Sequence, residues 1–298
     1  MSNAFETKGK VAGFYRWRPG AWLRVSGPDA ANFLQGQFTQ DLRELDQEPA
    51  AYGLWLNHKG RVLADSFVLK NGDQSFWVGS YFSPATVIKE RLEAFIIADD
   101  VTVEDQTLDW HGRTVFGGNA SIIPRIEGKG VSFPGRRMLN VHREYVFPES
   151  EAATSSSLIS MGEEWTFETM EAVRIGAKIP AIPFDLGPGE LPNEGGLELA
   201  AISYTKGCYL GQEVMARLKS MGQVRRRLVK VNGAGKAPPL PAPLFQGETR
   251  IGELRTAANV DTGFVGLALV SLLNAKWEQA ASWAPGAERT LTLEAPSS

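Results

Sequence analysis

Apolar and polar positions in the first half of the chain alternate with the two-residue period of β-strands. The longest such run covers residues 61–70 and ends at Asn71-Gly72, a pair typical of tight hairpin turns. The returning strand is predicted at residues 76–78. Shorter apolar runs predict further strands around residues 23–25, 101–103 and 145–147.

Apolar residues four positions apart predict helices between these strands. Ala30, Leu34, Phe38 and Leu42 form one apolar stripe, so a helix is expected over residues 30–42. A second helix is expected after Ser83-Pro84, with Ser83 as its N-cap and proline just inside. A third is expected over residues 167–178, ending before Pro180.

The pattern changes after Gly222. Helical periodicity becomes scarce, four prolines crowd residues 238–243, and short β-like runs occur at residues 227–231, 250–255, 264–270 and 290–293. We therefore expect an α+β fold. Residues 1–223 would form the α+β region and residues 224–298 a small all-β domain.

Composition supports an ordinary globular protein and excludes several classes. Hydrophobic residues make up 43% of the 298 residues and charged residues 22%, with a net charge of −3, so bulk nucleic-acid binding is not favoured. A single cysteine excludes an intrachain disulfide or a multi-cysteine metal site. No run approaches the roughly 18 apolar residues of a membrane span. The N-terminus lacks the apolar stretch of a secretory signal, and we expect a cytoplasmic protein without a bound metal.

That cysteine lies in the densest group of chemically active residues, Lys206-Gly207-Cys208-Tyr209-Leu210-Gly211-Gln212-Glu213. A short helix over residues 212–218 would place Cys208 near a helix N-terminus. Both that end and Lys206 would favour the thiolate. A reactive or metal-binding thiol is one interpretation. The other is a small buried cysteine in a turn.

Asp65 and Arg174 are charged residues at positions that otherwise face apolar layers. Asp65 shares its strand face with Leu63, Phe67 and Leu69. Either that strand is a solvated edge, or Asp65 binds a ligand or an internal cation. Arg174 would meet either an internal carboxylate or the carboxylate of a ligand. Together they suit a ligand with a polar fused ring and an acidic tail, as folate has.

A basic stretch follows the cysteine segment and includes Arg217, Lys219, Arg225, Arg226, Arg227 and Lys230. Such a stretch could bind phosphate or RNA, or it could be a solvated strand and loop.

The cysteine segment resembles the signature K-G-C-[YF]-x-G-Q-E of the YgfZ family, folate-binding proteins that support iron–sulfur enzymes. The segments 25–30, 60–65 and 251–254 are similar to further parts of that family. The wider superfamily is that of the glycine-cleavage T-protein, a tetrahydrofolate-dependent aminomethyltransferase with a folate channel and a C-terminal β-barrel. In the T-protein the strand matching Asp65 carries an Asp-Asp pair, whereas Ala64 precedes Asp65 here. This departure argues against aminomethyl transfer.

The resemblance implies T-protein-like folate-binding N-terminal domains, with two subdomains of ferredoxin-like α/β layers in residues 1–223 and a small C-terminal β-barrel in residues 224–298. It also implies an accessory factor for iron–sulfur cluster assembly or repair that binds tetrahydrofolate or a one-carbon derivative. Asp65 would contact the pterin, Arg174 the glutamate tail, and Tyr209 would pack beside the channel. Cys208 would be the functional thiol, with Lys206 tuning it and Gln212 and Glu213 shaping its loop. Glu144 and Glu149 are possible second pterin carboxylates.

By the same resemblance, the clients would be iron–sulfur enzymes, including those that thiolate tRNA. Two alternatives remain open: a true aminomethyltransferase and a tRNA-binding module.

Overall fold

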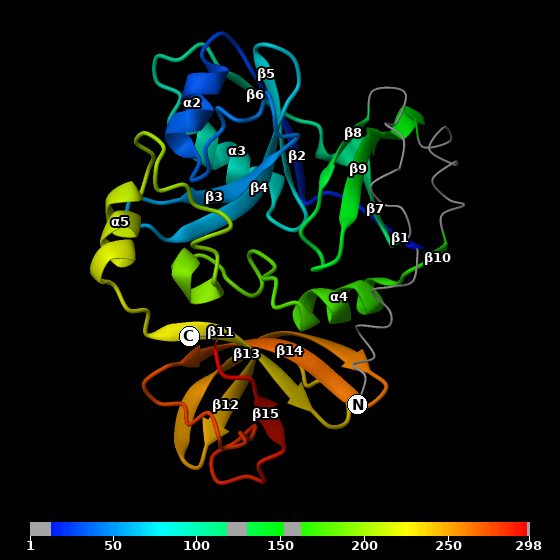
Figure 1. Ribbon diagram of the computed structural model, residues 1–298, viewed down its shortest axis with the longest axis vertical. Helices are drawn as coiled ribbons and strands as arrows, with labels where there is room; N and C mark the ends of the chain where they lie inside the picture. Colours follow the sequence, from blue (N-terminus) through cyan, green and yellow to red (C-terminus); the bar gives the residue numbers. More distant parts are fainter. Residues whose placement is uncertain (1–12, 118–129, 152–161, 297–298) are drawn as a thin grey trace.

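The computed structural model describes residues 13–117, 130–151 and 162–296, and it has an α+β architecture with three five-stranded sheets (Figure 1). We call these the N-terminal sheet, the second sheet and the C-terminal sheet. The predicted fold class is confirmed by this architecture and by the fold comparison given below.

The N-terminal sheet has the strand order β3-β4-β5-β2-β6, and all its neighbouring pairs are antiparallel. Two helices cover one of its faces. The elements are β2 (Ala21–Ser26), α2 (Ala30–Gln37), β3 (Ala51–Leu56), β4 (Val62–Lys70), β5 (Ser75–Ser80), α3 (Ala85–Glu93) and β6 (Thr102–Asp105). Leu23, Val25, Leu34, Trp55 and Ile88 are fully buried between the sheet and the helices.

The second sheet has the order β10-β1-β7-β9-β8. Its elements are β1 (Gly13–Trp17), β7 (Trp110–Phe116), β8 (Val131–Pro134), β9 (His142–Pro148) and β10 (Glu163–Glu164), with single 3₁₀ turns at Thr107–Asp109 and Glu149–Glu151. An aromatic cluster joins this sheet to the free face of the N-terminal sheet. Trp22, Trp77 and Trp110 contact one another within it, with ring centroids 4.7–5.7 Å apart.

The C-terminal sheet, of order β12-β13-β14-β11-β15, curls around its own core and forms the barrel at the bottom of Figure 1. Its strands are β11 (Arg226–Gly233), β12 (Ala242–Gln246), β13 (Thr249–Val260), β14 (Gly263–Ser271) and β15 (Leu291–Leu293). The helix α4 (Phe167–Gly176) lies on this barrel, where Ala172 and Ile175 pack against Ala258, Val265 and Leu267.

The remaining elements are a 3₁₀ turn at Pro192–Gly195 and the helix α5 (Gln212–Met221). Residues 180–218 pack their apolar side chains against Leu54, Leu56 and Val62 at the ends of β3 and β4. The cysteine segment is therefore attached to the N-terminal sheet.

Several predicted helix boundaries are wrong: the third helix ends at Gly176 and the short helix at Met221, and each of the first two differs at one end. The first helix ends at Gln37 because Phe38 is extended and pairs with Trp55. The N-cap of α3 is Pro84 rather than Ser83. The Ser83 hydroxyl is turned away from the helix and hydrogen-bonds Asp65 instead.

Candidate functional site

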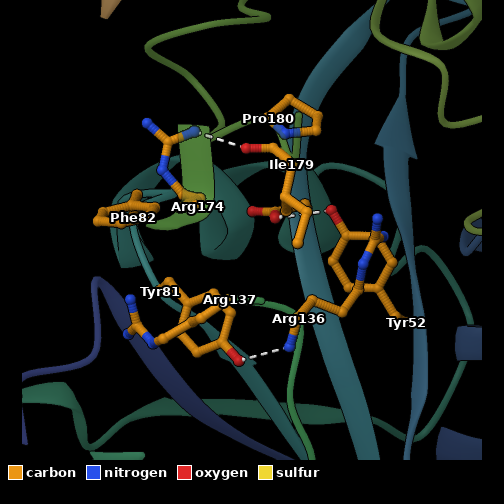
Figure 2. Close-up of a pocket in the computed structure, with 9 residues that line it drawn as sticks. Tyr52, Tyr81, Phe82, Arg136, Arg137, Arg174, Ile179 and Pro180 are labelled. Atoms are coloured by element: carbon orange, nitrogen blue, oxygen red, sulfur yellow. Dashed lines mark hydrogen bonds between the residues drawn. The ribbon is translucent and has the colours of Figure 1, made fainter. Parts of the chain in front are cut away.

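A small pocket lies where the two N-terminal sheets meet the segment that follows α4 (Figure 2). Its volume is about 10 Å³, close to the space that one water molecule needs. The residues that line it come from β3 and β4, the turn after β5, the β8–β9 loop of the second sheet, α4 and the segment after it: Tyr52, Asp65, Tyr81, Phe82, Arg136, Arg137, Arg174, Ile179 and Pro180. The pocket thus brings Asp65 and Arg174 together, although the sequence could not show that they share a site.

Asp65 is a buried acceptor in the lining of this pocket. Its strand β4 lies between β3 and β5, so the solvated-edge interpretation is wrong. Three hydroxyl groups donate to the carboxylate: Ser83 at 2.6 Å and Ser80 at 2.8 Å to Oδ1, and Tyr52 at 3.0 Å to Oδ2. Burial raises the pKa of Asp65, and these hydroxyl groups and Arg136 oppose that rise.

Two arginines of the β8–β9 loop reach into the pocket, and neither was predicted as a site residue. The Arg136 guanidinium lies 3.9 Å from the ring centroid of Tyr52, and that of Arg137 lies 3.8 Å from that of Tyr81. Figure 2 shows both arginines beside the two tyrosines. The signal in the sequence was slight: a Pro134-Gly135 turn followed by two arginines.

The two arginines differ in their partners. Arg137 is 2% exposed and lies 3.6 Å from Glu144, in an ion pair surrounded by aromatic rings. Arg136 is only partly buried. No side-chain hydrogen bond or ion pair of its guanidinium is found among the described residues, and its Nη1 is buried without a partner. Arg136 is therefore a cation with free donors.

Glu144 lies directly behind the pocket. It is fully buried and accepts hydrogen bonds of 2.7 Å from the hydroxyl groups of Tyr81 and Thr114. Glu149, the other candidate second carboxylate, lies on the exposed side of the second sheet and contacts His111. Of the two candidates, Glu144 is the one connected to the pocket through Tyr81.

Arg174 is held by an internal network. It is 2% exposed, and its Nε and Nη2 atoms bind the Glu171 carboxylate at 2.9 and 2.7 Å. Nη1 donates to Asp185 and to the Ile179 carbonyl, both at 2.6 Å, and Nη2 reaches Thr256 of the barrel at 3.2 Å. Burial alone would lower the pKa of Arg174, but Asp185 and Glu171 outweigh burial and raise it. All five N–H donors of the Arg174 guanidinium are occupied. Of the two interpretations, the structure therefore shows the pairing with internal carboxylates.

The cysteine segment lies at a second location. Cys208 is exposed, so the interpretation as a buried turn cysteine is wrong. Neither Cys208 nor Tyr209 lines the pocket. Gly211 packs against the turn after β3, because a Cβ atom there would lie 2.9 Å from the Asn57 carbonyl oxygen. Tyr52 at the pocket and Leu56 beside Gly211 lie four residues apart on β3, about 13 Å along the strand.

Other predicted residues of the segment have structural partners. Tyr209 is buried in the cluster that joins the segment to β3 and β4. The Lys206 ammonium donates to three carbonyl oxygens near the end of α2. Gln212 and Glu213 begin α5. The backbone N–H of Gln212 donates to the Tyr209 carbonyl oxygen at 3.2 Å. The predicted short helix after Cys208 is confirmed.

Much of the basic stretch is neutralised within the chain. Arg226 pairs with Glu194 at 2.9 Å, Arg227 with Glu198 at 3.2 Å and Lys230 with Glu294 at 2.7 Å. The first two ion pairs tie the barrel to the segment after α4, the third lies within the barrel, and all three reduce the charge that this surface offers to a polyanion.

Within residues 13–117, 130–151 and 162–296, no group of three or more His, Cys, Asp or Glu side chains could hold a metal ion. In the same ranges, no helix is long and apolar enough to span a membrane.

Comparison with known proteins agrees with the fold. Residues 19–126 match the GCVT N-terminal domain family, and residues 225–298 match the CAF17 C-terminal β-barrel domain family. The crystal structure of the glycine cleavage system aminomethyltransferase T from Bartonella henselae superposes with a TM-score of 0.79 at 16% identity, covering 98% of this chain and 87% of that one. The protein is therefore a member of the GcvT-like fold class.

Sequence relatives narrow this class. The iron–sulfur cluster assembly factor IBA57 of Mus musculus is 30% identical over 274 residues, which cover 84% of this chain and 75% of the relative. The tRNA-modifying protein YgfZ of Cronobacter sakazakii is 26% identical over 262 residues, which cover 82% and 79%. The chain belongs to the family of IBA57 and YgfZ.

Proposed function

We propose that the protein is a folate-binding accessory factor that supports iron–sulfur cluster assembly or repair. The observation that carries this proposal is the exposure of Cys208, the chain's only thiol, within a family whose named members include iron–sulfur cluster assembly factors. An exposed thiol is accessible to a partner protein or a cluster. One cysteine cannot hold a cluster by itself, so a partner or a second copy would supply the other ligands.

The donor groups of the pocket fit a reduced folate. The Asp65 carboxylate accepts three hydrogen bonds and retains one lone-pair position, on Oδ2, for an N–H group of a ring. Tyr52, Tyr81 and Phe82 offer aromatic surfaces to a fused ring. Glu144 is connected to this pocket through the Tyr81 hydroxyl, which donates to it.

A pterin ring fits into the pocket only after a side chain moves. A cavity of about 10 Å³ is far smaller than a pterin ring, and Arg136 occupies the face of Tyr52. Since the Arg136 guanidinium has no hydrogen-bonding or ion-pair partner among the described residues, its displacement from that ring breaks no ion pair. We therefore include in the proposal that Arg136 moves when the ligand enters.

The acidic tail of folate has two candidate contacts. Arg174 remains the contact implied by the family resemblance, and it could bind the tail only by exchanging one of its internal partners. Arg136 has free donors and needs no such exchange. The clients would be iron–sulfur enzymes, and any effect on tRNA would follow from enzymes of that class. A cytoplasmic location remains part of the proposal, since the relatives include mitochondrial proteins.

Calorimetric titration with 5-formyltetrahydrofolate tests the ligand. The wild-type protein should bind it, and Asp65→Asn should bind it at least about tenfold more weakly, the equivalent of one charge-assisted hydrogen bond. Lys236→Met, a change in an exposed residue of the barrel, serves as the matched control. No binding by the wild-type protein would refute the folate part of the proposal.

Turnover tests the enzymatic alternative. If the protein were an aminomethyltransferase, it would convert aminomethylated carrier protein and tetrahydrofolate, and this turnover would survive Cys208→Ala but not Asp65→Asn. We expect no such turnover.

A further inference from the structure

We propose that Lys206 is a positioning residue, which fixes the cysteine loop (residues 203–211) to the C-terminal end of α2 and so holds the Cys208 sulfur at a defined place on the surface. The proposal rests on the proposed function only in taking Cys208 as the functional thiol. It assigns Lys206 a mechanical role, in contrast to the thiol-tuning role expected from the sequence, which stays a prediction.

The first observation is the way the Lys206 ammonium is bound. Its Nζ atom donates to the carbonyl oxygens of Gln35 and Phe38 at 2.6 Å and of Gln40 at 3.1 Å, so all three of its protons are used. The residue is 5% exposed. This geometry fixes the lysine side chain at its ammonium group. The residues that it contacts lie 166–171 positions away in the sequence.

The second observation is that the C-terminal end of α2 favours a nearby positive charge. The last carbonyl groups of a helix lack intrahelical partners and carry partial negative charge. The last turn of α2 contains no basic residue of its own. Lys206 thus supplies from a distant segment the charge that a helix commonly obtains from a lysine or arginine in its last turn.

Other charged and aromatic groups surround the Lys206 ammonium. Burial lowers the pKa of Lys206 to about 8, with Asp41 opposing this and Arg43 adding to it. Asp41 is engaged with Arg43 at 2.5 Å. The Tyr209 ring centroid lies 5.4 Å from Nζ on the side of the cysteine loop.

The third observation is that the loop is attached on both sides of Cys208. Before it, the Ser203 amide donates to the Thr39 carbonyl at 3.0 Å, and the Thr39 hydroxyl donates to the Ala201 carbonyl at 2.6 Å. After it, Gly211 adopts φ = 88° and packs against Asn57. Lys206 is the attachment nearest to Cys208 on the N-terminal side, two residues away.

A fixed loop matters because the thiol is exposed. A sulfur that must meet a partner's cluster or thiol gains affinity and rate when its position is set beforehand, since less conformational entropy is lost in the encounter. An untethered exposed loop would sample many positions on the nanosecond scale. Lys206 therefore acts on Cys208 through the backbone of the loop.

The single cysteine makes the test direct. A nitroxide spin label attached to Cys208 reports the mobility of the loop by electron paramagnetic resonance. We expect a restricted spectrum for the wild type, and for Lys206→Met a rotational correlation time that is shorter by a factor of about three or more, within the nanosecond range of loop motion. Lys206→Arg, which keeps the cation, should restore much of the restriction.

The matched control is Lys59→Met, since Lys59 is an exposed lysine in the turn that contacts Gly211. Its spectrum should equal that of the wild type. If Lys206→Met does not fold, Lys206→Gln replaces it, because the shorter amide cannot reach all three carbonyl groups. Spectra of Lys206→Met or Lys206→Gln that match the wild type would overturn the proposal.

The functional arm uses unlabelled protein in cells that lack their own relative of this protein. Lys206→Met should reduce the activity of an iron–sulfur enzyme, and Lys206→Arg should recover most of it. If Cys208→Ala retains full support, the proposed function fails while the mobility result stands. If mobility is unchanged in Lys206→Met, the positioning role fails while the proposed function stands.

Discussion

The Tyr52 hydroxyl donates a 3.0 Å hydrogen bond to Asp65, while the ring of the same tyrosine carries the Arg136 guanidinium on its face at 3.9 Å. One side chain therefore connects the buried acceptor of the pocket with the cation that has free donors. Tyr52 also packs at the margin of the cluster that holds Tyr209. The ligand pocket and the cysteine segment are separate locations attached to the same strand, β3.

Asp65 should make folate binding depend on pH. The ionised carboxylate is the form that accepts an N–H group, and burial raises its pKa. Affinity should therefore fall as the pH is lowered through this raised pKa. Titrations with 5-formyltetrahydrofolate between pH 4 and pH 8 measure this. In Asp65→Asn, the affinity should be low and nearly constant over the same range.

The same raised pKa has a consequence for stability. The folded protein binds the Asp65 proton more tightly than the unfolded chain does. The unfolding free energy of the wild type, minus that of Asp65→Asn, should therefore fall as the pH rises from about 4, the unfolded pKa, to the folded pKa. Urea unfolding at several pH values measures the difference. A difference that rises with pH would contradict the assignment.

Arg136→Ala separates the two candidate contacts for the acidic tail. If Arg136 binds the tail, the variant should lose about tenfold or more in affinity for 5-formyltetrahydrofolate, as expected for a lost charge-assisted pair. Its affinity for 6-methyltetrahydropterin, which has no tail, should not fall. Arg143→Ala, which removes a contact to Ser132 on the same sheet, is the control. An equal loss for both ligands would argue against the tail contact.

Arg174→Met should destabilise the protein by about 3–5 kcal/mol, because Glu171 and Asp185 would remain buried without their cation. The loss should appear in urea unfolding monitored at pH 7. It should be accompanied by weaker docking of α4 on the barrel, because Arg174 also reaches Thr256. A loss below about 1 kcal/mol would show that the network is not the main role of this arginine.

Lys206 should give the protein a stability that rises with pH. Its folded pKa of about 8 lies below that of an unfolded lysine, so the unfolded chain binds more protons between these values. The unfolding free energy of the wild type, minus that of Lys206→Met, should be constant below pH 8 and increase by about 1–3 kcal/mol toward pH 10. A decrease over that window would be inconsistent with a buried ammonium.

Sequence reasoning worked where one residue contradicted its own pattern. Asp65 was identified because a carboxylate interrupted an apolar strand face, and the structure shows it buried among hydroxyl groups. Arg174 was identified for the same reason, but the pattern could not distinguish a ligand from Glu171 and Asp185. The strands and the three principal helices followed from periodicity because local spacing and burial agree.

Sequence reasoning failed where a distant segment decides the role of a residue. Ser83 has the features of a helix N-cap, yet Asp65 competes successfully for its hydroxyl group. Lys206 stands beside Cys208 in the sequence, yet its ammonium binds carbonyl groups of residues 35–40. Arg136 and Arg137 lie in a loop, where no periodicity marks the direction of a side chain.

Cys208→Ala provides the most direct test of the central claim that this exposed thiol supports iron–sulfur enzymes. The measurement is the activity of an iron–sulfur enzyme in cells lacking their own relative of this protein, complemented with wild type or with Cys208→Ala at equal protein level and equal melting temperature. We predict that the wild type restores the activity and that the folded Cys208→Ala variant does not. Full restoration by Cys208→Ala would contradict the account.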